Sequence, residues 1–135
     1  WRHLMDCLVF CYFVPLDLDR LARLVAAATG WNTNPWELLK VGERCHHLTR
    51  AFNVREGFGP EDDRLPRRFS SAFDSGPLAG VAVDPAALDA ARSTFYRMVG
   101  WDDQGVPTPE RLAELGLGWV AETLAGRRPS VIPQA

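Results

Sequence analysis

A carboxylate and a thiol lie five residues apart near the start of the chain, at Asp6 and Cys11, with apolar residues between and after them. On a helix this separation corresponds to a rise of about 8 Å, so the two side chains can address two adjoining groups. Cysteine thiolates are the usual ligands of iron–sulfur clusters, and an apolar surrounding limits water access and tunes the cluster potential. By itself the pattern is weak, because a single cysteine in an apolar segment is most often a small buried hydrophobe.

Three consecutive residues, Cys45, His46 and His47, also carry metal-ligand atoms. Consecutive helical residues point about 100° apart, so these side chains do not converge on one ion, and no second ligand pair has a zinc-like spacing. Because Cys45 falls on the apolar stripe of its predicted helix, we expect it in the core and both histidines at the surface or an interface. No phosphate-binding glycine loop and no serine–histidine–acid arrangement can be assigned.

Several charged residues follow this cluster. For Arg55 and Glu56 an ion pair that fixes a helix end is favoured over a place beside a cofactor or substrate channel. A charged run then either pins a long loop to a neighbouring domain, for which bidentate arginines are suited, or remains solvated. That run comprises Asp62, Asp63, Arg64, Arg67 and Arg68. Trp101 is expected to fill a pocket at a helix end.

Helical periodicity dominates the chain and must position these groups. A helix is predicted from about Leu18 to Thr29, with Asp17 as its N-cap and Gly30 as the left-handed residue that ends it. A second helix follows Asn34, where Glu37 completes a capping box. The predicted inward stripes are Leu18, Leu21, Val25 and Ala28 in the first helix, and Leu38, Val41, Cys45, Leu48 and Phe52 in the second.

The periodicity stops between Val54 and Val83, a stretch rich in glycine and proline. A structureless loop this long is improbable in a compact domain standing alone, so we expect it to lie against protein outside this chain. A third helix is predicted from Asp84-Pro85, a fourth from Thr108-Pro109, and a short last one around Trp119. The third should turn Leu88, Ala91, Phe95 and Met98 inward. Residues 127–135 are expected to form a flexible tail.

The composition excludes several classes of protein. With 47% hydrophobic and 24% charged residues and a net charge of -2, the chain is near the soluble globular average and has no field that would gather nucleic acid or an anionic membrane. Three cysteines, an odd number, suit a reducing compartment such as the cytoplasm. No apolar run approaches the roughly 20 residues of a membrane span. Because the chain opens with Trp1 and directly into a hydrophobic stretch, we expect a piece of a longer protein.

Five motifs stand in order along almost the whole chain. They are D-x-L-V-x-C-x-F at residues 6–13, TGW at 29–31, GERCHHLTRAFNVREGF at 42–58, DDRLPRRF at 62–69, and YRMVGWDDQGVPTPERLAELGL at 96–117. The first is similar to the D-x-x-x-L-C type of motif in the last domain of the aldehyde ferredoxin oxidoreductase family. The other four motifs resemble that family's blocks at the same spacings. Together the five motifs are strong evidence of a resemblance to this family.

The resemblance implies a mechanism for the parent enzyme. A tungsten or molybdenum centre held by two pterins takes two electrons from an aldehyde, which becomes a carboxylic acid. The electrons leave singly through a [4Fe–4S] cluster to ferredoxin or a similar carrier. By this resemblance Cys11 ligates the cluster metal, Asp6 hydrogen-bonds a pterin, and Val9 and Phe10 lie beside the cofactor. The family has a small Gly-Leu pair where this chain has Val9-Phe10.

We therefore expect an all-α domain over residues 1–126, with about five helices and one long irregular loop. It would be the cofactor-binding C-terminal portion of such an enzyme. Its partners would be the N-terminal and middle domains of the parent enzyme, which could assemble as a homo-oligomer. Because the other three cluster cysteines and a second pterin-binding motif are missing, the segment alone is expected to be inactive. The alternative is a non-catalytic helical scaffold or subunit-interaction domain, since an exposed apolar N-terminus and a long loop must cover something.

Overall fold

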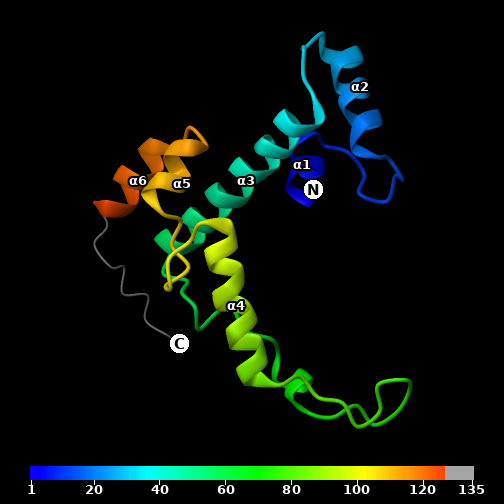
Figure 1. The fold of residues 1–135 in the computed structure, drawn as a ribbon, viewed down its shortest axis with the longest axis vertical. Helices are drawn as coiled ribbons and strands as arrows, with labels where there is room; N and C mark the ends of the chain where they lie inside the picture. Colours follow the sequence, from blue (N-terminus) through cyan, green and yellow to red (C-terminus); the bar gives the residue numbers. More distant parts are fainter. Residues whose placement is uncertain (127–135) are drawn as a thin grey trace.

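The computed structural model describes residues 1–126 and is built of helices (Figure 1). The elements are α1 (Arg2–Cys7), α2 (Leu18–Thr29), α3 (Pro35–Arg55), the 3-10 turn η1 (Arg67–Ser70), α4 (Pro85–Val99), α5 (Pro109–Glu114) and α6 (Gly118–Ala125). Within these residues the only β-type pairings are two isolated bridges, so the all-α prediction is confirmed. The predicted tail at 127–135 lies outside the described residues.

The helix ends follow local capping chemistry. The Asp17 carboxylate accepts a hydrogen bond from the Arg20 amide at 2.7 Å, and Gly30 ends α2 in the left-handed conformation. At α3, Asn34 accepts from the Glu37 amide at 3.1 Å, and the Glu37 carboxylate accepts from the Asn34 amide at 3.0 Å. These predicted caps are confirmed.

The long helix α3 runs through the middle of the molecule and connects α1 and α2 to α5 and α6 (Figure 1). Two separate apolar cores lie along it, one near each end. The first core joins α1, α2 and the start of α3, through Leu4, Met5, Leu21, Ala22, Val25 and Leu38. The second joins the end of α3 to α5 and α6, through Ala51, Leu112, Leu115, Leu117 and Val120. Both cores are small, so α3 carries most of the connection between them.

Much of the predicted α3 stripe is at the surface, contrary to the prediction. Leu38 is buried, but Val41, Leu48 and Phe52 are 39%, 36% and 55% exposed. The buried residues farther along the helix include Gly42, which lets α1 approach, and the polar His47 and Arg50. The buried face of α3 also contains the apolar Ala51 and Val54, but apolar periodicity cannot identify the glycine and polar residues between them.

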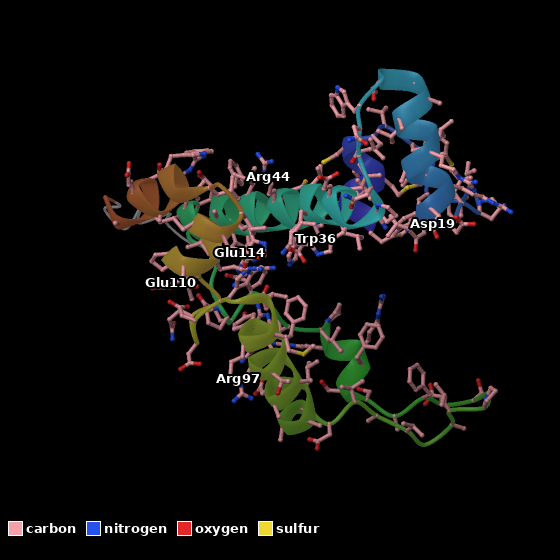
Figure 2. The ribbon with its side chains drawn as sticks, turned by 45° about the horizontal axis from the view of Figure 1, so that its top comes forward. Asp19, Trp36, Arg44, Arg97, Glu110 and Glu114 are labelled. Atoms are coloured by element: carbon pink, nitrogen blue, oxygen red, sulfur yellow. The ribbon has the colours of Figure 1, made fainter. Side chains whose placement is uncertain are left out.

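The α4 prediction was right about the helix and wrong about its inward face. Phe95 and Met98 are 45% and 80% exposed, and Tyr96 is the buried residue of this helix. The segment between α3 and α4 is irregular, as predicted, and its far end projects away from the rest (green in Figure 1). Charged side chains such as Asp19, Arg44 and Arg97 project from α2, α3 and α4 (Figure 2). No described helix has the length and apolar character needed to cross a membrane.

Candidate functional site

Helix α1 ends in a left-handed turn between Asp6 and Cys11. The Val9 amide donates to the Asp6 carbonyl at 3.1 Å, and the Phe10 amide donates to the Met5 carbonyl at 2.9 Å. Val9 between them has φ +54°, so these bonds form a Schellman-type helix end. Asp6 and Cys11 therefore do not lie on one continuous helix, and the rise of about 8 Å considered for a helix does not apply to them. Asp6 lies in the last turn of α1, and Cys11 follows the turn that ends it.

Valine is an unusual residue for this turn. A left-handed backbone brings Cβ close to the carbonyl oxygen, and only glycine adopts it without steric cost. Val9 is 93% exposed, so side-chain burial does not explain its presence. The site therefore has a locally strained backbone at the position where a glycine would fit.

The segment from Val9 to Val14 exposes an unusual amount of apolar surface. Val9, Tyr12 and Phe13 are 93%, 53% and 89% exposed, and Cys11 is also exposed. The segment is held at its two ends, where Phe10 and Leu16 pack against the first core. Four neighbouring residues that turn a thiol and three large apolar side chains outward indicate a surface suited to contact with another body.

The chemistry of Asp6 and Cys11 fits contact with a cofactor, although the two residues could not hold one by themselves. The Asp6 side chain is exposed and has no hydrogen bond or ion pair within residues 1–126, so its oxygens are available as acceptors. No group of three or more potential metal-binding side chains gathers anywhere in the described part of the chain. A metal centre bound through Cys11 would need further ligands from outside the described residues.

A second polar group lies where α1 crosses α3. The His3 Nδ1 atom is 3.8 Å from Cys45 Sγ, and His3 Nε2 is 3.1 Å from His46 Nδ1. The His46 ring stacks on Trp101, with 5.1 Å between centroids and 20° between planes. Burial lowers the pKa of His46, and the neighbouring His3, His47 and Arg50 lower it further. The His3–His46 hydrogen bond holds α1 against α3, and the buried Trp101, directly after the residue that ends α4, fills a helix-end pocket as predicted.

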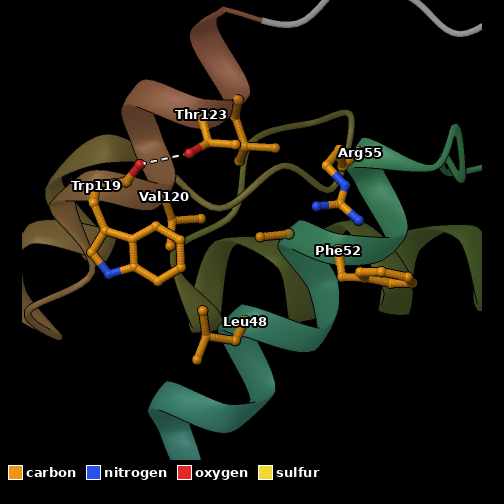
Figure 3. Close-up of a pocket in the computed structure, with 8 residues that line it drawn as sticks. Leu48, Phe52, Arg55, Trp119, Val120 and Thr123 are labelled. Atoms are coloured by element: carbon orange, nitrogen blue, oxygen red, sulfur yellow. Dashed lines mark hydrogen bonds between the residues drawn. The ribbon is translucent and has the colours of Figure 1, made fainter.

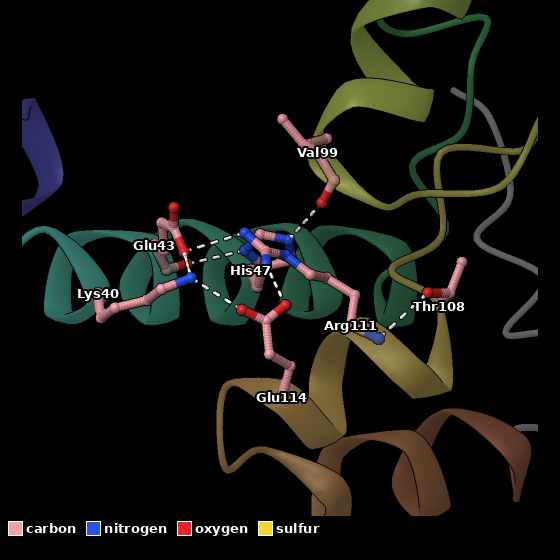
Figure 4. A network of polar contacts seen from close by, with 7 residues as sticks. All are labelled: Lys40, Glu43, His47, Val99, Thr108, Arg111 and Glu114. Atoms are coloured by element: carbon pink, nitrogen blue, oxygen red, sulfur yellow. Dashed lines mark hydrogen bonds and ion pairs between the residues drawn. The ribbon is translucent and has the colours of Figure 1, made fainter.

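His47 was expected at the surface or at an interface, and this was wrong. It is 1% exposed, with Nδ1 2.8 Å from the Glu43 carbonyl oxygen and Nε2 2.9 Å from the Val99 carbonyl oxygen (Figure 4). It therefore links the middle of α3 to the end of α4. The Glu43 carbonyl lies one turn back on α3, but the Val99 carbonyl comes from a distant segment and leaves no sign in the sequence.

The charged run of the long loop is anchored within this chain through Asp63. Arg50, 6% exposed, donates from Nη1 to Asp63 at 3.0 Å and from Nε to the Gly105 carbonyl at 2.7 Å. The Tyr96 hydroxyl donates to the same carboxylate. Burial alone would raise the pKa of Asp63, but the hydrogen bonds from Tyr96 and Arg50 outweigh it and lower the pKa. Burial and the bond to Asp63 raise the pKa of Tyr96.

Arg55 pairs with Glu56, as favoured from the sequence. Its Nε atom donates to the Glu56 carboxylate at 2.8 Å at the end of α3. Arg55 also lies at the edge of an apolar pocket between α3 and α6 (Figure 3). This pocket of about 210 Å³ is lined by Leu48, Ala51, Phe52, Arg55, Trp119, Val120, Thr123 and Leu124. The sequence missed it because Leu48 and Phe52 were assigned to the core.

The sequence also missed an ion network between α3 and α5. Lys40 lies 2.8 Å from both Glu43 and Glu114, and Arg111 lies 2.9 Å from Glu43 (Figure 4). Arg111 also pairs with Glu114. Lys40 with Glu43, and Arg111 with Glu114, are spaced three residues apart on one helix, a signal that was available. The ion pairs that join α3 to α5, Lys40 with Glu114 and Arg111 with Glu43, have no such signal in the sequence.

The amino-acid sequence of the chain is similar to those of known proteins. A family model described as "Aldehyde ferredoxin oxidoreductase, domains 2 & 3" matches residues 1–117. The chain is 35% identical over 118 residues to a tungsten-containing aldehyde ferredoxin oxidoreductase from Pyrococcus furiosus. It is 33% identical over 117 residues to one from Pyrococcus horikoshii. Each match covers 84% of this chain and 19% of the relative, so the chain spans about a fifth of their length.

A solved structure shares the fold. It is the active site complex BamBC of benzoyl coenzyme A reductase, in complex with 1,5-dienoyl-CoA. The TM-score is 0.77 at 25% identity, and the match covers 98% of this chain and 20% of that chain. The helical arrangement is therefore similar to a part of a larger redox complex.

Proposed function

The chain belongs to the aldehyde ferredoxin oxidoreductase family, and on that premise we propose that it is the cofactor-binding C-terminal portion of a tungsten- or molybdenum-bispterin, [4Fe–4S] aldehyde oxidoreductase. The observation that carries the proposal is the exposed pair Asp6 and Cys11 on either side of the left-handed turn. Both stand in the part of the chain that the family model matches.

Each residue of the turn has its own task. The Asp6 carboxylate, free of partners within residues 1–126, accepts hydrogen bonds from pterin N–H groups. The Cys11 thiolate provides one iron ligand. Val9 and Phe10 lie against the cofactor, and the exposed rings of Tyr12 and Phe13 keep water from it. When bound, the pterin-held metal supplies the two-electron oxidation of an aldehyde to a carboxylic acid, and the cluster supplies single-electron transfer to ferredoxin or a similar carrier.

The chain performs none of this alone. It offers one candidate cluster ligand and about a fifth of the length of its relatives. The remaining ligands and the second pterin-binding motif come from the N-terminal and middle domains of the parent. The isolated chain is therefore inactive. The parent enzyme works in the cytoplasm, where the three cysteines remain reduced, and can assemble as a homo-oligomer.

A second candidate function is supported by the exposed apolar side chains far from this turn. Met98 on α4 is 80% exposed and Trp119 on α6 is 61% exposed, beside the apolar pocket. These surfaces favour a scaffold that holds domains or subunits together without touching a cofactor. The two functions differ in whether Asp6 and Cys11 affect cofactor content.

Pterin content tests the assignment of Asp6. In the complete enzyme, purified anaerobically, Asp6→Asn should lower pterin per polypeptide several-fold, because the amide cannot accept with both side-chain ends. Asp19→Asn, an exposed aspartate on α2, is the matched control and should leave it unchanged. Normal pterin and tungsten content with full aldehyde oxidation in both Asp6→Asn and Asp6→Ala would overturn the assignment and favour the scaffold.

A further inference from the structure

The two cysteines not used by the proposed function, Cys7 and Cys45, lie on facing helices where α1 and α3 are in close contact. A Cβ atom added at Gly42 of α3 would lie 3.2 Å from Leu4 Cβ of α1, so the backbones nearly touch there. Cys45 is one turn beyond Gly42 on α3, and Cys7 is one turn beyond Leu4 on α1.

A contact from His3 fixes the register of the two helices. His3 Nδ1 is 3.8 Å from Cys45 Sγ. Because His3 and Cys7 are four residues apart on α1, their side chains lie on the same face of that helix. The face that touches Cys45 therefore also carries Cys7.

The pKa of the Cys7 thiol is also consistent with a position next to Cys45. Partial burial raises the pKa of the Cys7 thiol, and the adjacent Cys45 thiol raises it further, followed by Asp6. A raised pKa keeps the thiol protonated and slow to react, so the pair stays reduced without an oxidant. Cys7 is nevertheless exposed and Cys45 half-buried, so a small oxidant can reach the pair.

We propose that Cys7 and Cys45 form an oxidation-responsive disulfide that joins α1 to α3. The oxidant is a low-molecular-weight disulfide such as oxidised glutathione. The thiolate of exposed Cys7 attacks one sulfur of the oxidant, forming a mixed disulfide and releasing one thiol. The Cys45 thiolate then attacks the Cys7 sulfur of that mixed disulfide, so the second thiol leaves. Two protein thiols are oxidised, the oxidant is reduced to two thiols, and the two protons end on those thiols.

The cross-link would act on the segment that contains Cys11. α1 ends four residues before Cys11, and it is held to α3 by packing and by the His3 contacts. A covalent bond at Cys7 closes the loop of chain from Leu8 to Arg44 and limits separation of α1 from α3. Oxidation therefore stabilises the base of the exposed turn without using Cys11.

Peptide mapping after oxidation tests the proposal. Trypsin leaves Cys7 and Cys11 together in the peptide His3–Arg20 and places Cys45 in the peptide Cys45–Arg50. The experiment therefore uses the Cys11→Ser chain, treated with oxidised glutathione and alkylated before digestion. We expect the two peptides joined by a disulfide, a mass decrease of two hydrogen atoms in the intact chain, and a rise in Tm of about 5–10 °C that dithiothreitol reverses.

The matched control is Cys7→Ser with Cys11 intact, checked by circular dichroism to be folded. It should form no intramolecular disulfide and show no rise in Tm. Glutathione adducts without a cross-link in Cys11→Ser would overturn the proposal. A cross-link to Cys45 that persists in Cys7→Ser would also overturn it, because Cys11 would then be the partner.

Discussion

The Asp63 carboxylate receives both terminal nitrogens of the Arg50 guanidinium, Nη1 at 3.0 Å and Nη2 at 2.8 Å. This bidentate pair joins the long loop to the middle of α3, and Tyr96 of α4 donates to the same carboxylate. The loop was expected to be held, if at all, by a neighbouring domain. Its first half is instead anchored by a nearly buried arginine of the same chain.

Neutralising Asp63 should destabilise the chain. Asp63→Asn leaves the Arg50 guanidinium nearly buried without a counter-charge, so we expect the free energy of unfolding to fall by about 2–3 kcal/mol. Asp103→Asn, an exposed position in the turn before α5, should change it by less than about 0.5 kcal/mol. Urea unfolding measures both, and equal effects would show that the pair contributes little.

Adding a methyl group at Gly105 should be far more harmful than at Gly30. Both glycines are left-handed, with φ +70° and +74°, so both alanines carry a backbone cost of about 1–2 kcal/mol. At Gly105 the new Cβ would also lie 2.1 Å from Arg50 Nη2 and 2.9 Å from the Tyr96 ring, whereas Gly30 has nothing within 4 Å. Thermal unfolding should therefore show a larger loss for Gly105→Ala, by at least about 2 kcal/mol. Similar losses at both sites would argue against the close packing around Arg50.

Replacing Val9 with glycine should stabilise the chain. The native φ of +54° costs a β-branched residue about 1–2 kcal/mol, and glycine removes that cost while adding some unfolded-state entropy. We expect a net gain of about 0.5–1 kcal/mol, seen as a higher Tm. Val14→Gly, at a position without positive φ, is the control and should lower the Tm. A lower Tm for Val9→Gly would mean that the turn is not left-handed in solution.

Stability should fall as the solution is acidified from pH 7.5. The pKa of His46 is lowered, by burial first, and therefore the unfolded chain binds this proton more readily than the folded chain. The contribution of His46 to the free energy of unfolding is fully present above the ordinary histidine pKa of about 6.5. It is lost as the pH falls from there toward the lower pKa that His46 has in the folded chain. The carboxyl pKa values of Asp63 and Glu43 are also lowered, so their contributions are lost at still lower pH.

Urea midpoints measured between pH 7.5 and 3 separate these groups. His46→Gln should remove the part of the decline near pH 6.5 and leave the later part, which belongs to the carboxylates. An unchanged decline in His46→Gln would show that this histidine is not buried as the stacking on Trp101 requires.

Local signals in the sequence predicted the helix ends well, and packing over longer distances explains the errors. Asp17, Gly30, Asn34 and Glu37 act within a few residues of their own backbone, so their roles follow from spacing alone. The buried face of α3 depends instead on Gly42 meeting α1 and on polar contacts of His47 and Arg50 with segments far along the chain. An apolar stripe contains no information about such partners.

The cofactor roles of the candidate site residues stay predictions, and the structure describes only their surroundings. The motif identified Asp6 and Cys11, and both side chains are exposed. The sequence did not predict the reversal of the chain at Val9, because a valine gives no signal for a left-handed residue. A glycine there would have predicted the helix end correctly.

The proposed role of Cys11 as an iron ligand is tested most directly by iron analysis and EPR of the complete enzyme. The enzyme is purified anaerobically as wild type, as Cys11→Ser and as the matched control Cys7→Ser. We predict that Cys11→Ser lowers the iron content from about four atoms per cluster to three or fewer and alters the EPR signal of the reduced cluster, while Cys7→Ser matches the wild type. Wild-type iron content and an unchanged cluster signal in Cys11→Ser would contradict the assignment.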